Sequence, residues 1–328
     1  MGKWKIPPKA CLTCGVRGYM DRPELYFQNM TWKQVEERLK ENDVLIVPVG
    51  STEQHGGGAP PGEDTFLVTR MAEQVALRTG ATIAQPIWYG SHPYHHIGMP
   101  GTIVIPEDIF TGYVRGVIAG FWNAGFRKQI LLNGHGQEYV IPVAIHQFAK
   151  IYQVPAILIN VNWYHAIPDL VKDKEHGGPF ETPFIHADEV ETSFSMALFP
   201  EMIDKEAFED TEPWGYLPKG HIDKAGNVYQ MPIRWYEHVG GGPVEVYAYP
   251  PGVVGKPSLA EPEKAKPGLE ALLDYLERLI DDVLERFPPG KLPPIEQMTQ
   301  RPREEVEAVL KGPFERGGRH LYTLHYPP

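Results

Sequence analysis

Val44-Leu45-Ile46-Val47-Pro48-Val49, followed by Gly50-Ser51-Thr52-Glu53-Gln54-His55-Gly56, is the stretch that indicates the fold of this chain. The first six residues contain no polar side chain, which predicts a short strand buried on both faces. The polar segment after them begins and ends with glycine, as expected of a loop at the carboxyl end of a strand, where α/β enzymes place their chemistry. Asp64 follows eleven residues after Glu53. Three side chains that can bind metal ions therefore lie close to one strand end.

The chemistry of these three side chains favours a transition metal. Glu53 and Asp64 supply carboxylate oxygens and His55 supplies an imidazole nitrogen, a mixture that suits Zn²⁺, Mn²⁺ or Fe²⁺ better than Ca²⁺ or Mg²⁺. A hydrolytic metal site is the first hypothesis. The alternative is a glycine-rich turn with incidental polar residues, so the rest of the chain must distinguish the two.

Strands and helices alternate along most of the chain. Thr31 and Gln34 form a capping-box pattern at a helix start, and Gly80 is placed to end the helix that follows Asp64. Strands are predicted at 44–49, 81–86, 129–132 and 156–161, and helices at about 31–42, 64–80, 106–124, 139–152 and 261–287. This alternation predicts an α/β protein, specifically a three-layer α/β/α fold with a largely parallel central sheet.

The same pattern divides the chain into one domain with two extensions. Residues 1–30 precede the first predicted helix, and residues 31–287 form the predicted α/β/α domain. Within this domain, 205–257 is irregular and rich in Gly, Pro and aromatic residues, which indicates a lid, a subunit contact or a passive insertion. Residues 288–328 form a proline-rich extension that is not expected to build a core of its own.

Composition narrows the classes of partner and location. The 328 residues include 31 basic and 42 acidic side chains, and the net charge of −11 would repel nucleic acid and anionic membranes. No stretch approaches the roughly 20 apolar residues of a membrane span, and the N-terminus does not resemble a signal peptide, so a cytoplasmic protein that acts on a small molecule is expected. Cys11 and Cys14 lack the second pair that a zinc ribbon needs, which leaves a structural or incidental role.

Two further polar clusters lie where the sheet is expected to bind ligands. Asn133-Gly134-His135-Gly136-Gln137-Glu138 follows a predicted strand directly, and His186-Ala187-Asp188-Glu189-Val190-Glu191-Thr192-Ser193 lies at a predicted helix start. In the second cluster, Thr192 or Ser193 could cap the helix, while the acidic residues would interact favourably with the dipole at the N-terminus of the helix. Because the strand ends of a parallel sheet meet at one edge, the three clusters are expected to converge.

These motifs, taken together and in order, resemble the creatininase (creatinine amidohydrolase) family. The resemblance spans roughly residues 30 to 200, and the helix from Glu261 is similar to the closing helix of the family. The matching motifs are Glu53-Gln54-His55-Gly56 with Asp64, Pro100-Gly101-Thr102, Asn133-Gly134-His135-Gly136, and His186-Ala187 through Glu191-Thr192-Ser193. The segment 205–257 and the tail beyond Pro288 fall largely outside the resemblance.

The resemblance implies an α/β/α enzyme with a centre of two divalent metal ions, Zn and/or Mn or else Fe. By motif, Glu53 would bind one ion, His55 and His135 would bind the other, and Asp64 would bridge both. Members of the family usually assemble as hexamers, so a homo-oligomer is expected.

One metal ligand of the family is missing here. Creatininase itself has a glutamate two residues after its second histidine, at the position of Gln137 in this chain. A carboxamide is not an equivalent ligand, so the remaining carboxylate must come from elsewhere. Glu191 is the expected ligand, with Glu189 or Glu138 as substitutes.

The resemblance also implies the groups that act on the substrate. His186 and Glu189 are the predicted catalytic residues, and His186 matches the family histidine thought to pass a proton to the leaving atom. The alternative for His186 is a histidine that only orients a metal-bound carboxylate. The predicted substrate-binding residues are Ser91, His96, Gln137 and Glu138. Of His92, His95 and His96, one is expected to contact the substrate and the others to lie at the surface.

The reaction expected from the resemblance is hydrolysis of a small cyclic substrate. Gly136 stands where creatininase has a substrate-contacting tyrosine, and a pocket rich in polar groups suits a hydroxyl-bearing ring. The favoured substrate is therefore a cyclic polyol ketone of inositol catabolism, such as 3-dehydro-scyllo-inosose. An amidohydrolase acting on a cyclic amide or formamide is the first alternative, and a non-catalytic sugar-binding or assembly protein is the second.

Overall fold

Four parallel strands form the sheet of this protein in the order β2-β1-β3-β4. The computed structural model describes residues 23–93, 96–212, 245–313 and 315–325. The strands are β1 (Val44–Val49), β2 (Thr82–Ile83), β3 (Lys128–Asn133) and β4 (Ile157–Asn162). Val49 lies opposite Asn133, which lies opposite Asn162. Three strands therefore end at the same level, and the loops that follow them begin side by side.

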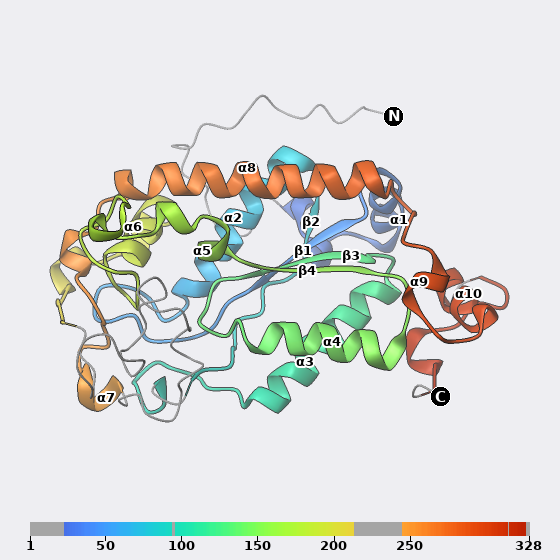
Figure 1. Ribbon diagram of the computed structural model, residues 1–328, viewed down its shortest axis with the longest axis horizontal. Helices are drawn as coiled ribbons and strands as arrows, with labels where there is room; N and C mark the ends of the chain where they lie inside the picture. The colour runs from blue at the N-terminus through green and yellow to red at the C-terminus, as the bar shows by residue number, and fades with distance from the viewer. Residues whose placement is uncertain (1–22, 94–95, 213–244, 314, 326–328) are drawn as a thin grey trace.

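Helices cover both faces of the sheet (Figure 1). On one face lie α2 (Glu63–Thr79), α6 (Glu189–Leu198) and α8 (Pro262–Arg286); on the other lie α3 (Glu107–Asn123) and α4 (Val140–Tyr152). The predicted three-layer architecture with a parallel sheet is confirmed. None of the helices in the described part of the chain combines the length and the apolarity of a membrane span.

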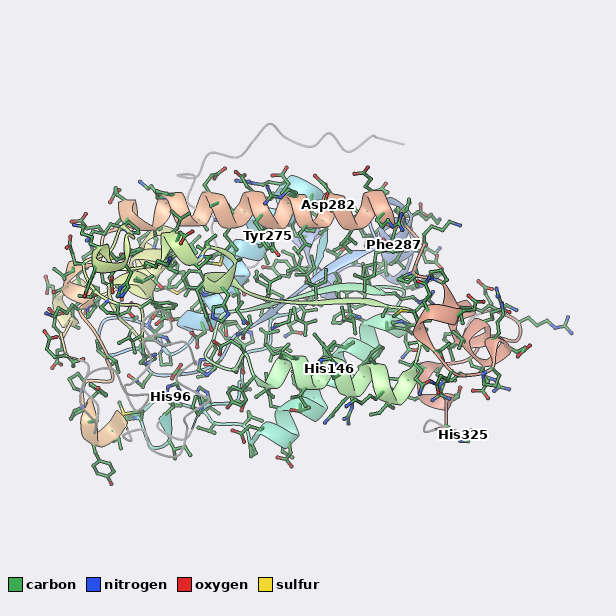
Figure 2. The ribbon with its side chains drawn as sticks, viewed as in Figure 1. His96, His146, Tyr275, Asp282, Phe287 and His325 are labelled. Carbon is green, nitrogen blue, oxygen red and sulfur yellow. The ribbon has the colours of Figure 1, made fainter. Side chains whose placement is uncertain are left out.

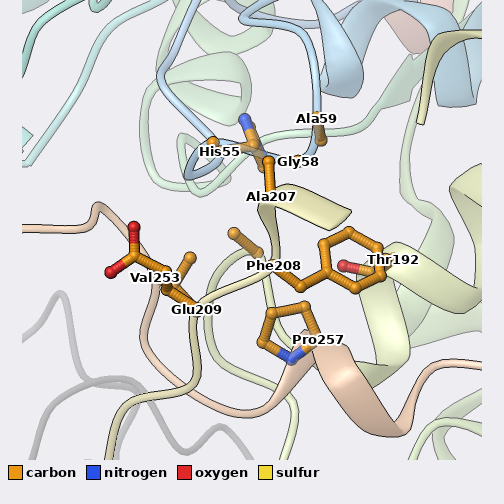
Figure 3. A pocket seen from close by; sticks show the side chains of 11 residues that line it. His55, Gly58, Ala59, Thr192, Ala207, Phe208, Glu209, Val253 and Pro257 are labelled. Atoms are coloured by element: carbon orange, nitrogen blue, oxygen red, sulfur yellow. The ribbon is translucent and has the colours of Figure 1, made fainter. Parts of the chain in front are cut away.

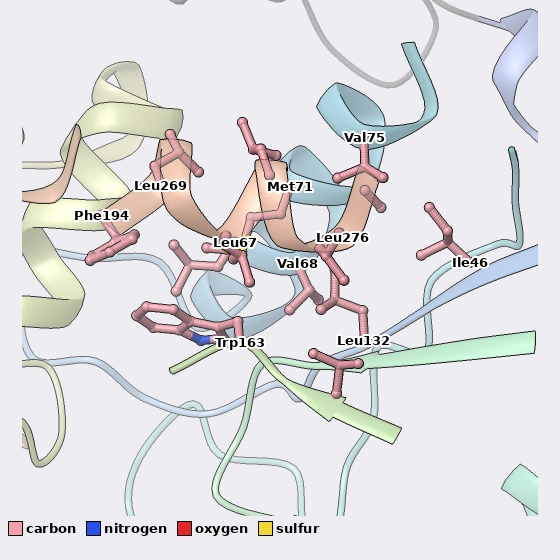
Figure 4. Close-up of a cluster of buried hydrophobic side chains, with 14 of the residues drawn as sticks. Ile46, Leu67, Val68, Met71, Val75, Leu132, Trp163, Phe194, Leu269 and Leu276 are labelled. Carbon is pink, nitrogen blue, oxygen red and sulfur yellow. The ribbon is translucent and has the colours of Figure 1, made fainter. Parts of the chain in front are cut away.

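The largest apolar cluster lies between the sheet and the helices α2 and α8. Figure 4 shows Leu67 and Met71 of α2 packed with Leu269 and Leu276 of α8, and Trp163 lies below them. Each such buried side chain contributes roughly 1.5–3 kcal/mol relative to an exposed one. The helices of this layer therefore have a fixed position relative to the strand ends.

Side-chain caps set the starts of two helices, the first helix of the domain and α6. At α1 (Trp32–Glu41), Thr31 and Gln34 form the predicted capping box. At α6, the Asp188 carboxylate accepts hydrogen bonds from the backbone N–H groups of Val190 and Glu191. The interpretation of Thr192 or Ser193 as the cap was wrong, because both residues lie inside the helix.

The described parts of both extensions pack onto the domain. Tyr26 is buried, and its hydroxyl donates to Glu73 of α2 at 2.5 Å. In the C-terminal extension, α9 (Ile295–Met298) precedes α10 (Arg303–Lys311), and Val309 and Leu321 join the core beneath α3 and α4. Cys11 and Cys14 lie outside the described residues.

The irregular segment predicted at 205–257 is described only in part, because 213–244 lies outside the described residues. Its described part contains the short helix α7 (Glu245–Ala248), and α5 (Trp163–Ala166) follows β4 earlier in the chain. The remaining elements are short 3₁₀ helices at Pro23–Leu25, Phe27–Asn29, Pro168–Leu170, Lys174–His176, Pro200–Met202, Lys205–Ala207, Pro257–Leu259 and Leu321–Thr323.

Candidate metal centre

Side chains from four separate segments meet at the carboxyl end of the sheet. Glu53 and His55 come from the loop after β1, Asp64 from the first turn of α2, His135 from the loop after β3, and Glu191 from the first turn of α6. All five are buried. Figure 2 shows His96 at this end of the molecule, opposite the end where His325 lies. The convergence expected from the strand ends is thus observed.

The first group of ligand atoms, the carboxylate-rich half, consists of His55, Asp64 and Glu191 with Glu63 beside them. One ligand atom from each of His55, Asp64 and Glu191 lies within 4.8 Å of the other two. His55 Nε2 is 3.5 Å from Asp64 Oδ1, 3.6 Å from Glu191 Oε2 and 3.9 Å from Glu63 Oε2. The distances place several oxygens around one nitrogen without direct hydrogen bonds, as ligands of a common cation would lie.

The second group, the imidazole-rich half, consists of Glu53, His92, His96 and His135, whose ligand atoms also lie within 4.8 Å of one another. Glu53 Oε1 is 2.6 Å from His96 Nδ1, and Glu53 Oε2 is 2.9 Å from His135 Nδ1. One carboxylate and three imidazoles form a donor set that suits Zn²⁺ or another transition metal.

Asp64 lies between the two halves. Its Oδ1 is 3.5 Å from His55 Nε2, and its Oδ2 is 3.1 Å from His135 Nδ1. Ser51 donates a hydrogen bond to Oδ2 at 2.7 Å and fixes the carboxylate. The orientation is the one that a bridging ligand requires. His135 lies with Glu53 in the other half, whereas the expectation from the motifs grouped it with His55.

The buried polar atoms of this region fit bound cations. His55 Nε2 and Glu63 Oε2 are buried without a hydrogen-bond partner among the described residues. Buried polar atoms nearly always have a partner, so two such atoms facing each other suit a cation that both can bind. The donor types, their burial and their spacing agree with two adjacent divalent ions.

Charges within the centre shift the pKa values of its histidines upward. Burial alone would lower the pKa of His135, but the carboxylates of Glu53 and Asp64 raise it to about 10. The pKa of His55 is likewise raised well above its usual value by Glu63 and Asp64, against the effect of burial. Burial would raise the pKa of Glu53, but the surrounding histidines hold it well below its usual range. A cation bound at either imidazole would compete with the proton that these carboxylates favour.

The pKa of Glu191 shifts in the direction opposite to that of Glu53, and the pKa of His92 in the direction opposite to those of His55 and His135. Burial and repulsion from Glu63 and Asp64 raise the pKa of Glu191 well above its usual value, although His55 opposes the shift. Burial, with repulsion from His135, lowers the pKa of His92 to about 4. His92 is therefore a neutral imidazole at pH 7, the form that binds metals.

Gln137 holds the loops of the centre together through its carboxamide. Its Nε2 donates to the Gly50 carbonyl at 3.0 Å and to Asn133 Oδ1 at 3.2 Å, while its Oε1 accepts from the Ser91 N–H at 3.0 Å. Both ends of the carboxamide bond to the loops of the centre, which supports a positioning role for Gln137. Its predicted substrate-binding role stays a prediction.

Backbone carbonyls orient the histidines of the centre. His135 Nε2 lies 3.0 Å from the Ser91 carbonyl oxygen, and His55 Nδ1 lies 2.9 Å from that of Glu53. In each ring the other nitrogen is thereby directed at the carboxylates, as in many metal sites. Ser91 reaches the centre through its backbone. Glu138 is buried but does not belong to any of the three ligand groups found among the described residues.

Glu189 and Glu191 lie two residues apart and have different surroundings. Glu189 Oε1 accepts from Lys264 Nζ at 2.7 Å, and its Oε2 accepts from the N–H groups of Glu181 and Thr182 at 2.8 Å each. Glu189 therefore ties α6 to α8 and to a loop. Both of its oxygens bond to groups outside the centre, and its predicted catalytic role stays a prediction.

His186 lies at the edge of the centre and forms a third group with Glu53 and His55. Its ring centroid is 4.6 Å from that of His55. Its Nε2 lies 2.9 Å from the Gln54 carbonyl oxygen. The Gln54 carboxamide nitrogen lies 3.0 Å from the same Nε2. A carbonyl oxygen accepts and a carboxamide N–H donates, so the two contacts require opposite protonation states of Nε2, and the state depends on the tautomer of the ring. The predicted role of His186 as a proton donor stays a prediction.

A hollow opens beside His55 (Figure 3). It is lined by the loop from Gly57 to Ala59 and, from the other side, by Ala207, Phe208 and Val253. Phe208 leaves no room for a side chain at Gly58, since an added Cβ would lie 2.3 Å from Phe208 Cδ1. The described part of the predicted lid segment thus packs directly on the first metal-binding loop.

Two residues of the centre were not predicted as ligands from the sequence. Glu63 adjoins Asp64 at the start of α2, and its position next to a ligand was the signal available. His92 was expected at the surface if His96 contacted the substrate, but both are buried, with 2 % and 5 % of their surface exposed. The surface interpretation was wrong for His92, and His95 lies outside the described residues.

Comparisons with known proteins agree with the fold and show the family. A family model described as Creatininase: Creatinine amidohydrolase matches residues 28–280. The 3-dehydro-scyllo-inosose hydrolase of Thermotoga maritima is 69% identical over 305 residues, which cover 93% of this chain and 98% of the relative. The creatinine amidohydrolase of Pseudomonas putida is 26% identical over 287 residues, covering 81% and 98% of the two chains. A solved structure described as Creatininase Mn superposes with a TM-score of 0.63 at 24% identity, covering 81% of this chain and 99% of the other.

Fold and site together define an α/β/α protein with two adjoining groups of metal ligands at the carboxyl end of a parallel sheet. The family match covers well over half of the chain, and its relatives are hydrolases. The chain belongs to the creatininase family.

Proposed function

We propose that this protein is a dinuclear-metal hydrolase that opens a cyclic polyol ketone, with 3-dehydro-scyllo-inosose as the substrate. The main support is the 69% identity to the Thermotoga maritima hydrolase across nearly the whole of both chains. The buried ligand groups that share Asp64 provide independent support from the geometry.

The ligands we propose are Glu53 and His135 for one ion and His55 and Glu191 for the other, with Asp64 between them. Two ions bound in this way would polarise a substrate carbonyl and lower the pKa of a bound water toward about 7. Glu191 then takes the place of the carboxylate that is absent at Gln137. The proposed ions are Zn²⁺ and/or Mn²⁺, with Fe²⁺ as a further choice.

The ring-opening reaction also needs a proton donor among the side chains of the protein. Water adds to one ring carbonyl and loses a proton, and the C–C bond breaks between this carbon and the hydroxyl-bearing carbon that separates it from the second carbonyl. The ring opens to a carboxylate, and the electron pair of the broken bond is delocalised into the second carbonyl as an enediolate. The carbon that gains this electron pair must then be protonated. His186 is the proposed donor, since it lies at the edge of the centre with its ring centroid 4.6 Å from that of His55, and imidazoles commonly donate protons near neutral pH.

Two further aspects of the proposal come from the family resemblance and the composition. We propose that the protein is a homo-oligomer, with the hexamer as the expected form. The acidic net charge of −11 supports a cytoplasmic enzyme that acts on a small molecule and does not bind nucleic acid or a membrane surface.

A substrate panel on metal-replete and chelated enzyme tests the proposal. We expect ring opening of 3-dehydro-scyllo-inosose only with metal bound, and a kcat decrease of about 10²- to 10⁴-fold in His186→Asn. The matched control is His146→Asn, on the exposed side of α4. Turnover of creatinine or of a formamide instead would favour the amidohydrolase alternative. Two bound metals without turnover of any of these compounds would favour the binding or assembly protein.

A further inference from the structure

His92 is the residue of the centre whose surroundings are least explained by the protein alone. Its side chain is fully buried. Neither ring nitrogen has a hydrogen-bond partner among the described residues. A buried imidazole in such a position is costly unless another group binds one of its nitrogens.

The ring of His92 is directed into the imidazole-rich half. Its Nδ1 lies 3.9 Å from Glu53 Oε1, and its ring centroid lies 4.4 Å from that of His135 and 5.8 Å from that of His96. A separation of 3.9 Å is too long for a hydrogen bond. Two donors bound at about 2.1 Å to one ion lie about 3–4 Å apart, so the separation fits two ligands of the same cation.

We propose that His92 supplies a nitrogen ligand to the imidazole-rich half and makes this half select Zn²⁺ over Mn²⁺. The inference rests on the proposed function only in requiring that the centre binds divalent ions. A neutral imidazole adds a borderline-soft donor without adding negative charge, and such donors favour Zn²⁺ over the harder Mn²⁺.

Contacts of Ser91 and Gly90 fix the backbone of the loop that carries His92. The N–H of Ser91 donates to Gln137 Oε1, and the Ser91 carbonyl lies 3.0 Å from His135 Nε2. Gly90 allows this close approach, because an added Cβ would lie 2.6 Å from Gln137 Oε1. The carboxamide of Gln137 thus positions the loop that carries His92. Gln137 itself cannot serve as a carboxylate ligand.

The contrast with the carboxylate-rich half makes the selectivity measurable. There His55 is surrounded by the carboxylates of Glu63, Asp64 and Glu191, a set that accepts Mn²⁺ more readily. The two halves should therefore differ in their preference when both ions compete.

Metal analysis of His92→Asn after equilibration with equal Zn²⁺ and Mn²⁺ tests this inference. We expect wild-type protein to bind two ions per chain, and the variant to lose at least tenfold in Zn²⁺ preference at one of them while the other is unchanged. His146→Asn is the control. A second variant, His92→Cys, should give a thiolate-to-metal charge-transfer band when loaded with Co²⁺, which reports ligation directly even if the first variant folds poorly.

The outcomes separate this inference from the proposed function. Unchanged Zn²⁺ preference in His92→Asn, with no charge-transfer band in His92→Cys, would overturn the role of His92 and leave the hydrolase proposal intact. A wild-type protein that binds no divalent ion would overturn both. Two bound ions without turnover of 3-dehydro-scyllo-inosose would overturn only the proposed substrate, because metal selectivity is measured without it.

Discussion

The carboxylate-rich half and the imidazole-rich half share Asp64, but different means fix them in place. Glu63 and Asp64 lie in the first turn of α2 and Glu191 in the first turn of α6, where the positive end of a helix dipole stabilises carboxylates. The imidazole-rich half has its histidines on loops that Gln137 and Asn133 tie together. The first half is thus supported by helices packed on the core, and the second by a hydrogen-bond network.

The largest effect is expected where the halves meet. In Asp64→Ala, both ions should be lost and kcat/KM should fall by about 10³-fold or more, because one carboxylate serves both halves. Metal analysis and a steady-state assay measure the two effects. Asp169→Ala, which alters an exposed carboxylate, is the control. Two retained ions in Asp64→Ala would contradict the bridging role.

A substitution confined to the carboxylate-rich half should reduce metal binding in that half only. Glu191→Gln is expected to reduce the metal content from two ions to one, since a neutral carboxamide is a weak replacement for a carboxylate beside His55. Elemental analysis of the dialysed protein gives the count. If both ions remained, the ligand role of Glu191 would have to pass to Glu63.

A substitution that weakens the hydrogen bonds between the loops should reduce metal affinity in the imidazole-rich half. The effect should be smaller than those of the two substitutions above. Gln137→Ala removes three hydrogen bonds that position Gly50, Ser91 and Asn133. Loss of such supporting contacts typically weakens metal affinity by about 10- to 100-fold. Titration with a fluorescent chelator should show weaker binding of one ion, while the affinity for the other ion stays at the wild-type value. Equal weakening of both would show that the halves are not independently supported.

Acid should weaken metal binding in both halves. Glu53 and Asp64 raise the pKa of His135 to about 10, and Glu63 and Asp64 raise that of His55. A metal ion must displace the proton that the carboxylates favour on these imidazoles, so affinity should rise with pH by up to about tenfold per unit for each proton released. Calorimetry in buffers of different ionisation enthalpy measures the released protons. Metal affinity that does not change between pH 6 and 8 would be inconsistent with this picture.

The smallest effect on the centre is expected for Glu189→Gln, two residues from Glu191. Metal content should not change, but the buried ion pair with Lys264 is broken, and the free energy of unfolding should fall by about 3 kcal/mol. Denaturant unfolding measures this loss. A loss of metal in Glu189→Gln, at unchanged stability, would instead restore Glu189 to the active site.

Glu189 and Glu191 also show where prediction from the sequence ended. Both belong to one motif, and both were expected to act on metal or substrate. Residues two apart on a helix point about 200° apart, so only one of them can face the centre. Which one does so depends on how α6 is rotated against α8 and the sheet, which the motif itself does not specify.

Period, capping and loop position are local properties of the chain, so the sequence predicts the strands, the helices that cover them and most of the side chains that gather at the carboxyl ends. The three-dimensional packing was needed to learn that His135 lies with Glu53, that Gln137 bonds within the protein, and that His92 is buried in the centre. These relations join residues distant in the chain, and they depend on side-chain directions that are fixed when the layers pack together.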